Sequence, residues 1–374
     1  MSNDREVEEA KHVPRNARFT IISSIIAFII LLAGLLSAFL DVEQEEDITK
    51  PTGSTPNLAY CPSNGHPDGD GMYTSSKMNE LSTLTVATYN AEWLFDGIDD
   101  PYRTYQSADS HISDVARVIS RLNADVINIV ELEDCSVLSR VSELISHQGT
   151  RNLWVPPTGD TATHQSIGLI TTLPVTPPGI QRIDTRAEYP VAGSQCGVAS
   201  HGNGGKMKTS GVTKHWWGVY YVNGFEILMI GLHLKARPNH PQSCAKREAQ
   251  AQVISELVKL HGGNREILIM GDFNDFDGNI LDISNNQPNS NVLKTLSTDL
   301  GLMSVHRYLP QTERFTWSGQ HDPSSNMWPD SAMDFILISE GLQAYTEAVW
   351  VDRNDSFGSV SDHLPLAIRF RFSN

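Results

Sequence analysis

The sequence predicts an α/β or α+β sandwich, because short apolar β-type runs alternate with helical patterns over most of its length. Its 374 residues, of which 40% are hydrophobic, are enough for one large domain or two ordinary ones. The 27 glycines and 19 prolines follow no fixed period, which excludes solenoids, collagens and coiled coils. A formal net charge of −16 argues against a broad basic surface that coats nucleic acid, although it allows a local basic cleft.

The expected elements follow the apolar periodicity along the chain. Strands are expected at residues 83–88, 126–130, 216–222, 225–232, 266–270, 334–339 and 364–372. Helices are expected over residues 112–122, where the apolar side chains fall on one face, and from about 245 to 261. Asn223-Gly224 separates two of the strands, and this pair predicts a hairpin with a type I′ turn, because both residues tolerate positive φ angles.

One long apolar segment, residues 19–40, lies near the N-terminus and contains no charged side chain. As a helix it would be about 33 Å long, which matches the core of a bilayer. Lys11, Arg15 and Arg18 precede it and acidic residues follow it, so the positive-inside rule predicts a cytosolic tail over residues 1–18. We expect an uncleaved anchor rather than a signal peptide, because the apolar run exceeds a usual h-region. The rest of the chain is then extracytoplasmic or lumenal.

Residues 41–80 are acidic and then rich in Pro, Gly, Ser and Asn, which is typical of a flexible tether before a folded domain at 81–374. All four cysteines lie beyond the apolar segment, where an oxidising compartment favours two disulfides. Cys196 and Cys244 lie on opposite flanks of the predicted hairpin, which folds them back beside each other. We therefore expect the pair Cys196–Cys244, which leaves Cys61 for Cys135.

Polar residues that can carry chemistry follow the predicted strands directly. These positions are Asn90, Glu92, Glu131, His233, Asp272, Asn274, Asp362 and His363. Carboxylates and carboxamides supply the oxygen ligands that suit Mg²⁺ or Mn²⁺, and imidazoles transfer protons. The set therefore predicts metal-assisted hydrolysis of a charged ester. A zinc site and a serine hydrolase are disfavoured, because the sequence has no close His/Cys pair with ligand spacing and no G-x-S-x-G motif.

Six motifs in a fixed order resemble the endonuclease/exonuclease/phosphatase superfamily, also called the DNase I-like superfamily. They are TVATYNAEWLFD, DVINIVELED, GLHLK, ILIMGDFNDF, MDFILIS and SDHLPL, and together they span residues from about 83 to 372. The superfamily includes DNase I, abasic-site endonucleases, inositol-polyphosphate phosphatases and neutral sphingomyelinases. The resemblance implies a four-layer α/β (α+β) sandwich, in which two packed mixed β-sheets are flanked by helices.

The resemblance also implies a metal centre and a general base. Glu131 would hold the divalent metal, Mg²⁺ or Mn²⁺, with help from Asn90 and Asp362. His363 would act as the general base or place the attacking water. Asp334 would accept the other N–H of this imidazole and so fix its tautomer.

The remaining site residues would act on the phosphate group. Asp272 and Asn274 would orient the water and a phosphate oxygen, and His233 would stabilise the transition state. A histidine rather than an asparagine at position 233 moves the sequence away from abasic-site endonucleases. Lys235 and Arg237 follow on the same segment and either clamp phosphate or are solvated.

The substrate class stays open between two kinds of phosphate ester. We favour a membrane-anchored nuclease. The alternative is a phosphatase or phospholipase C-like enzyme that acts on inositol phosphates, sphingomyelin or other phospholipids, which a membrane tether would serve. The sequence lacks the W-x-G-D-x-N-x-R form expected of inositol-polyphosphate phosphatases. A catalytically dead scaffold domain is disfavoured because every expected catalytic position carries competent chemistry, and we infer no protein partner.

Overall fold

The computed structural model describes residues 61, 81–98, 103–145, 151–156, 160, 163–176, 179–198, 208–319, 329–356 and 358–372. The predicted cytosolic tail, the membrane span and, apart from Cys61, the tether lie outside these residues, so they stay predictions. Within the described ranges, no helix is long and apolar enough to span a bilayer.

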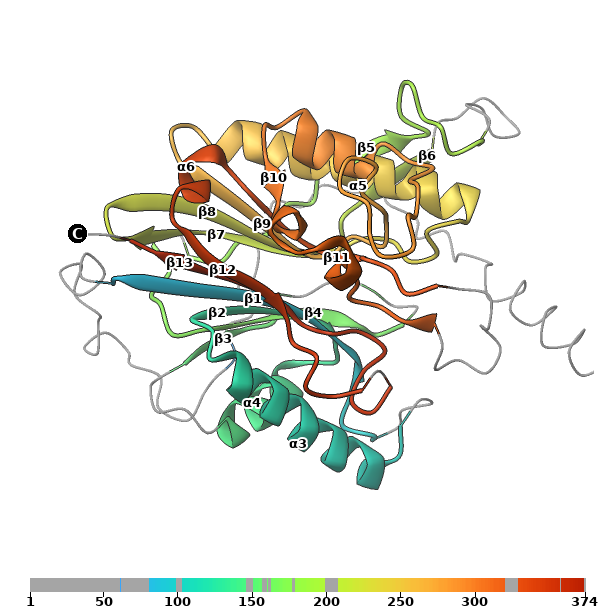
Figure 1. Cartoon of the computed structure of the whole chain (residues 1–374). Helices are drawn as coiled ribbons and strands as arrows, with labels where there is room; N and C mark the ends of the chain where they lie inside the picture. The colour runs from blue at the N-terminus through green and yellow to red at the C-terminus, as the bar shows by residue number, and fades with distance from the viewer. Residues whose placement is uncertain are drawn as a thin grey trace, which may run out of the picture. The chain divides into compact units, whose positions relative to one another are not determined.

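Two mixed β-sheets form the centre of the fold (Figure 1). The first has the order β12-β13-β1-β2-β4-β3 and consists of β1 (Thr83–Leu94), β2 (Val126–Leu132), β3 (Asn152–Trp154), β4 (Ser166–Thr171), β12 (Thr346–Val351) and β13 (Leu366–Arg371). The second has the order β10-β11-β9-β8-β7 and consists of β7 (Lys214–Val222), β8 (Phe225–His233), β9 (Glu266–Asp272), β10 (Met303–Ser304) and β11 (Asp334–Ile338). The pairs β1–β2 and β8–β9 are parallel.

Helices cover the outer faces of both sheets, as Figure 1 shows. The first sheet carries α3 (Tyr105–Leu122) and α4 (Cys135–Leu144), and the second carries α5 (Pro241–His261). Shorter elements are the π-helix η1 (Lys294–Thr298), the 3₁₀-helices η2 (Val305–Tyr308) and η3 (Gln311–Glu313), α6 (Glu340–Gln343), and the strand pair β5 (Arg186–Tyr189) and β6 (Lys208–Gly211). The predicted four-layer sandwich is confirmed.

The central strands are buried on both faces, so their sequences are nearly continuous apolar runs rather than alternating ones. In β9, Leu268 and Met270 pack between the two sheets, whereas Ile267 and Ile269 pack in the layer under α5. In β2, Val126 and Val130 likewise face the second sheet, and the apolar residues between them face α3 and α4. Each sheet is thus fixed from both sides, which makes the ends of these strands a rigid support.

The hairpin between β7 and β8 has the turn that its sequence predicts. Asn223 and Gly224 have φ angles of 47° and 86°, and Val222 pairs with Phe225 across the turn. The following helix starts earlier than expected, at Pro241. Proline suits the first helical position, and His240 caps the helix by accepting the N–H of Ser243 at Nδ1.

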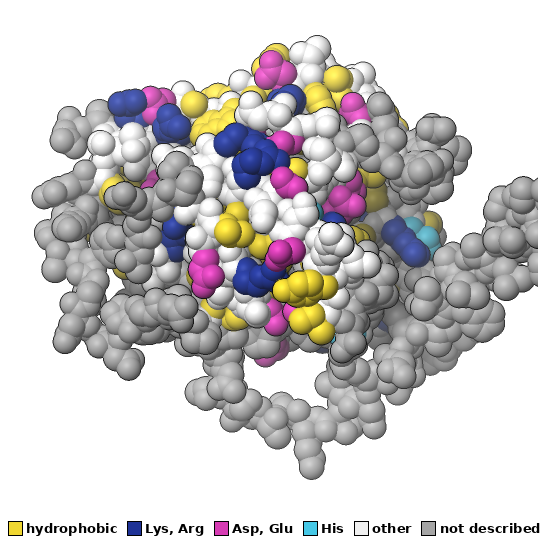
Figure 2. All heavy atoms as spheres, turned by 90° about the horizontal axis from the view of Figure 1, so that it is seen from below, with side chains coloured by type: hydrophobic (Ala, Val, Ile, Leu, Met, Phe, Trp, Pro, Cys, Tyr) yellow, Lys and Arg dark blue, Asp and Glu magenta, His cyan; other side chains and the backbone are white. Residues whose placement is uncertain are grey.

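Figure 2 shows the face that lies over α3 and α4, where acidic and basic side chains are interspersed. Arg117 pairs with Asp114 and Asp355, and Arg140 of α4 pairs with Asp109. These arginines of α3 and α4 therefore have acidic partners close by.

Both expected disulfides are present. Cys196 is joined to Cys244 in the first turn of α5, and Cys61 is joined to Cys135 at the start of α4. All four cysteines are used in these two bonds. The predicted pairing is therefore confirmed.

Candidate active site

The register of the strands brings the predicted site residues together at one end of the sandwich. His233, the last residue of β8, pairs with Asp272, the last residue of β9. Asp272 also pairs with Asp334, the first residue of β11, on its other side. In the first sheet Asn90 pairs with Val130, the neighbour of Glu131. Three side chains of the second sheet thus form one row, opposite two of the first.

Asn90 joins the two rows. Its amide Nδ2 donates to Glu131 Oε1 at 3.3 Å in the first sheet and to Asp272 Oδ2 at 3.2 Å in the second. Its Oδ1 accepts the backbone N–H of Glu92 at 3.0 Å. Asn90 is almost fully buried, so these bonds are shielded from water. A single carboxamide therefore sets the distance between the two carboxylates.

His363 is held from both its backbone and its ring. Its N–H donates to Ser361 Oγ at 3.0 Å, and the Ser361 hydroxyl donates in turn to the carbonyl of Asn90 at 2.8 Å. Its Nδ1 lies 2.7 Å from Asp334 Oδ2. Asp334 is placed by its own N–H, which donates to Thr316 Oγ1 at 3.0 Å. With Nδ1 engaged by the carboxylate, Nε2 faces the remaining cluster.

Asp272 lies between the two imidazoles. Its Oδ2 is 3.7 Å from His233 Nε2 and 3.9 Å from His363 Nε2, while its Oδ1 accepts the N–H of Asn274 at 2.8 Å. Asn274 has a left-handed backbone with φ of 49°, and its Nδ2 donates to the carbonyl of Leu234 at 3.3 Å. The end of β9 is thereby tied to the end of β8.

Backbone strain gathers at the same end of the sandwich. Glu92, Trp93 and Glu131 have φ angles of 45°, 53° and 62°, a region that residues other than glycine rarely adopt. Bonds across the site hold this conformation: Trp93 N–H donates to Glu131 Oε2 at 3.2 Å, and the guanidinium of Arg103 donates to the carbonyls of Glu92 and Trp93. Such strain is typical of functional sites.

The pKa values of the two histidines are shifted in opposite directions. Burial lowers the pKa of His233 well below its ordinary value, and the neighbouring charges of Lys214 and His363 lower it further. Burial also opposes a charge on His363, but Asp334, Asp362 and Asp272 outweigh it and raise its pKa well above the ordinary value. Burial and the nearby positive charges thus favour a neutral His233, whereas the surrounding carboxylates favour a protonated His363.

Burial also raises the pKa values of the acids. Burial and the negative charge of Asp334 raise the pKa of Asp272 to about 7, and burial and Asp362 raise that of Glu92 to about 7. The pKa of Glu131 is raised by the same two causes, burial and Asp362. The site thus holds several carboxylates that repel one another when ionised.

The donor set fits a divalent cation. Among the described residues, Glu131, Asp272 and Asp362 bond to no lysine or arginine side chain, so little positive charge balances them directly. Asp334 Oδ1 is buried and has no hydrogen-bond partner in the described chain. Carboxylate oxygens of this kind are the ligands that Mg²⁺ and Mn²⁺ prefer. A metal would relieve their mutual repulsion.

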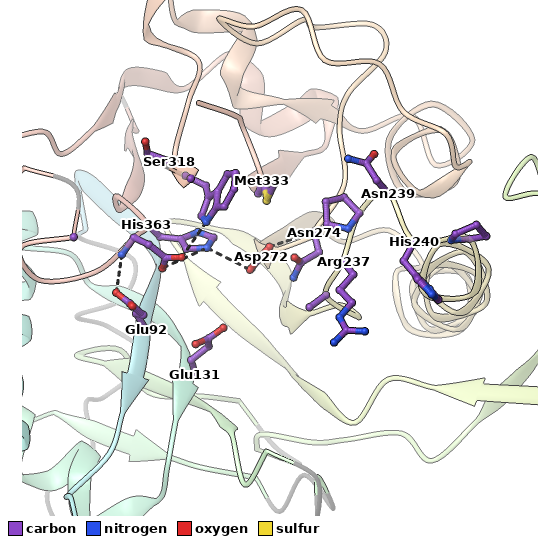
Figure 3. Close-up of a pocket in the computed structure, with 17 residues that line it drawn as sticks. Glu92, Glu131, Arg237, Asn239, His240, Asp272, Asn274, Ser318, Met333 and His363 are labelled. Atoms are coloured by element: carbon purple, nitrogen blue, oxygen red, sulfur yellow. Dashed lines mark hydrogen bonds and ion pairs between the residues drawn. The ribbon is translucent and has the colours of Figure 1, made fainter. Parts of the chain in front are cut away.

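The acids open into a cleft of about 930 Å³ (Figure 3). Of the predicted site residues, Glu131, Asp272, Asn274, Asp362 and His363 line it. Asn90, His233 and Asp334 lie among them but do not line the cleft wall, so the structure brings the whole predicted set to one place.

Other parts of the cleft wall are less evident in the sequence. Residues 236–241 and 317–319 contribute to it, and Arg237 and His240 are drawn on this wall in Figure 3. No sequence motif includes His240, so the sequence alone predicts only a surface or packing role for it. Trp317 donates from Nε1 to Asp362 Oδ2 at 3.0 Å, although no motif marks it. Lys235 is exposed but does not line the cleft.

Comparison with known families agrees with this geometry. A profile of the Endonuclease/Exonuclease/phosphatase family matches residues 87–363, from within β1 to the histidine that pairs with Asp334. The chain belongs to this family. Membership places the protein among the phosphoester hydrolases of nuclease and phosphatase type. A search of curated proteins gives no match.

Two solved structures are similar to this chain, and the first of them shares its fold. An endonuclease/exonuclease/phosphatase from Beutenbergia cavernae has a TM-score of 0.51 at 16% identity and covers 78% of this chain and 72% of its own. Truncated TDP2 from Caenorhabditis elegans has a TM-score of 0.49 at 15% identity, covering 79% of this chain and 100% of its own. At such identities the likeness concerns the fold alone.

Two substitutions should separate metal binding from proton transfer. Glu131→Gln removes a negative charge from the cluster and should raise the Mg²⁺ concentration for half-maximal activity by about tenfold or more. His363→Ala should abolish turnover at every Mg²⁺ concentration. Phosphodiester hydrolysis measured over a Mg²⁺ titration checks both, with Glu188→Gln on exposed β5 as a matched control. Full rescue of His363→Ala by Mg²⁺, with none for Glu131→Gln, would reverse the two assignments.

The pH–rate profile should depend on the metal concentration. Proton transfer to His363 requires its neutral form, whereas the surrounding carboxylates raise its pKa and favour the charged form. A cation on these carboxylates weakens that effect, so the acidic limb of kcat/KM should move to lower pH as Mg²⁺ increases. Profiles recorded at low and high Mg²⁺ test this. An acidic limb at the same pH in both would contradict it.

Proposed function

We propose that the protein is a metal-dependent phosphodiesterase that cleaves nucleic acid. The observation that carries this proposal is the cleft itself, in which the clustered acids and the segment 236–241 line one continuous cavity of about 930 Å³. A single phosphate group occupies only part of this volume, so a phosphodiester with groups on both sides fits better than a small monoester. Arg237 on the same wall adds a cation for a flanking phosphate.

The reaction follows from the positions of the side chains. His363 accepts a proton from water at Nε2 while Asp334 accepts the Nδ1–H and stabilises the imidazolium. The water oxygen forms a bond to phosphorus, and the P–O bond to the leaving group breaks. The leaving oxygen keeps the electron pair of that bond and takes up a proton from solvent water. Asp272 and Asn274, tied together at the end of β9, orient the water and a phosphate oxygen. Neutral His233 donates a hydrogen bond to the phosphoryl oxygen as its negative charge grows.

Glu131, with Asn90 and Asp362, would hold Mg²⁺ or Mn²⁺, which supplies charge neutralisation for the phosphate when bound. Divalent metals are general in the superfamily. A cation would also relieve the repulsion between the acids at the strand ends, whose only positively charged neighbour among these ion pairs is His363.

A second candidate is hydrolysis of a phospholipid head group. The observation in its favour is that Ala236, Pro238, Pro241 and Met333 make part of the cleft wall apolar. A lipid substrate would also suit the membrane anchor predicted for residues 19–40. Hydrolysis of phospholipids or inositol phosphates, without cleavage of DNA or RNA under the same metal conditions, would favour this candidate over the nuclease.

We expect the salt dependence of binding to identify a nuclease. Removing a side chain that neutralises one phosphate lowers the slope of log Kd against log salt, so Arg237→Ala should weaken oligonucleotide binding and lower the slope by about one unit. Fluorescence anisotropy over a salt series, with a non-hydrolysable oligonucleotide, measures this slope. The exposed Lys259→Ala on α5 is a control of equal charge change away from the cleft. Equal slopes for both variants would contradict an Arg237–phosphate interaction.

The cellular location is part of the proposal. The basic flank before residue 19 should retain the N-terminus in the cytosol, so the hydrolase domain lies on the other side of the membrane. A tag fused after Asn374 should resist protease in sealed vesicles whose interior corresponds to the extracytoplasmic side. Digestion of the tag before detergent is added would show the opposite topology.

A further inference from the structure

Arg247 is a fully buried arginine that lies behind the cleft wall. It belongs to α5 and is 0% exposed. Its Nε donates to Asp275 Oδ2 at 3.0 Å. Its Nη1 donates to the carbonyls of Lys235 and Arg237, both at 3.1 Å, and its Nη2 donates to the carbonyl of Pro238 at 2.7 Å. One guanidinium thus binds three carbonyls of the segment 235–238 and one carboxylate.

The carboxylate partner connects this network to the catalytic row. Asp275 directly follows Asn274 and is itself buried. Its Oδ2 also accepts the hydroxyl of Ser290 at 2.6 Å, and its Oδ1 accepts the N–H of Phe276 at 2.9 Å. The Arg247–Asp275 pair therefore joins the end of β9 to the segment after β8, behind the side chains that line the cleft.

The segment needs this support because its backbone is strained. Arg237 has φ of 71°, a conformation that costs an L-residue free energy. Arg247 binds the carbonyls on both sides of this strained region, at Lys235 and at Arg237. Gln250, one turn further along α5, accepts the N–H of Lys235 at 2.9 Å. The conformation that places Arg237 on the cleft wall is thus set from α5 (Figure 3).

A buried ion pair is a poor way to gain stability alone, because removing both charges from water costs about as much as their attraction returns. The planar guanidinium of an arginine has several donors in fixed directions, so it is well suited to holding carbonyls at set positions. We infer that Arg247 is a positioning residue, which holds the segment 235–238 and with it the contacts to substrate beyond the scissile phosphate. This inference rests on the proposed phosphodiesterase function.

The test compares a long with a short substrate. Arg247→Lys keeps the charge but cannot make the same four bonds, so KM for an oligonucleotide should rise about tenfold with little change in kcat. Kinetics with bis(p-nitrophenyl) phosphate, which does not reach beyond the scissile group, should change by less than about twofold. Arg314→Lys is the matched control, since Arg314 also binds carbonyls, at Leu309 and Leu281, but outside this cleft.

A double-mutant cycle separates positioning from general destabilisation. In an Arg237→Ala background the effect of Arg247→Lys on KM should largely vanish, because the side chain that it positions is gone. An equal effect in both backgrounds, or equal losses with both substrates, would overturn the inference. If Arg247→Lys does not fold, Ser290→Ala weakens the same network at Asp275 and should shift KM in the same direction; unchanged KM would overturn the inference equally.

The proposed function and this inference can fail separately. If the wild-type protein cleaves no nucleic acid but hydrolyses a phospholipid, the proposed substrate is wrong, and the same cycle on that phospholipid still tests Arg247. If the wild-type protein cleaves the oligonucleotide and the cycle is additive, the function stands and the positioning role is refuted.

Discussion

The carboxamide of Asn90 is the constraint on which the site depends. It bonds to a carboxylate of each sheet and is buried between them. The packed layer between the sheets sets their separation, and the two bonds of Asn90 fix Glu131 and Asp272 relative to each other at its edge. The hydroxyl of Ser361 donates to the backbone carbonyl of Asn90 and accepts the N–H of His363, so the position of His363 also depends on Asn90. Asn90 therefore contributes both to the placement of the proposed metal ligand Glu131 and, through Ser361, to that of His363.

The arrangement of the site lowers the stability of the fold. Buried acids with raised pKa values repel one another, and left-handed residues such as Glu92 and Glu131 add backbone strain. The rest of the fold offsets these costs with strands that are packed on both faces and with helices on both outer sides. A proposed cation would act on the same balance, because it removes the repulsion between the ionised carboxylates.

Much of this site is predictable because its residues sit directly at strand ends. The strands are recognisable as apolar runs, and the register then places His233, Asp272 and Asp334 side by side. Arg247 and Trp317 are not predictable, for a physical reason. Their roles depend on partners that tertiary packing brings close. The neighbouring sequence of a helical arginine or a loop tryptophan does not distinguish such a role from an ordinary surface position. The strain at Arg237 likewise has no signature in composition.

The disulfide between Cys196 and Cys244 makes the order of the cleft wall depend on the redox state of the compartment. Cys244 lies in the first turn of α5, one turn before Arg247. The disulfide therefore fixes the start of the helix that carries Arg247, whose side chain bonds to the cleft wall. Disulfides persist in oxidising compartments and are rare where thiols are kept reduced. A copy of the protein retained in a reducing compartment would lack the fastening and present a looser cleft. Formation of this disulfide would then be a condition for a fully ordered cleft wall.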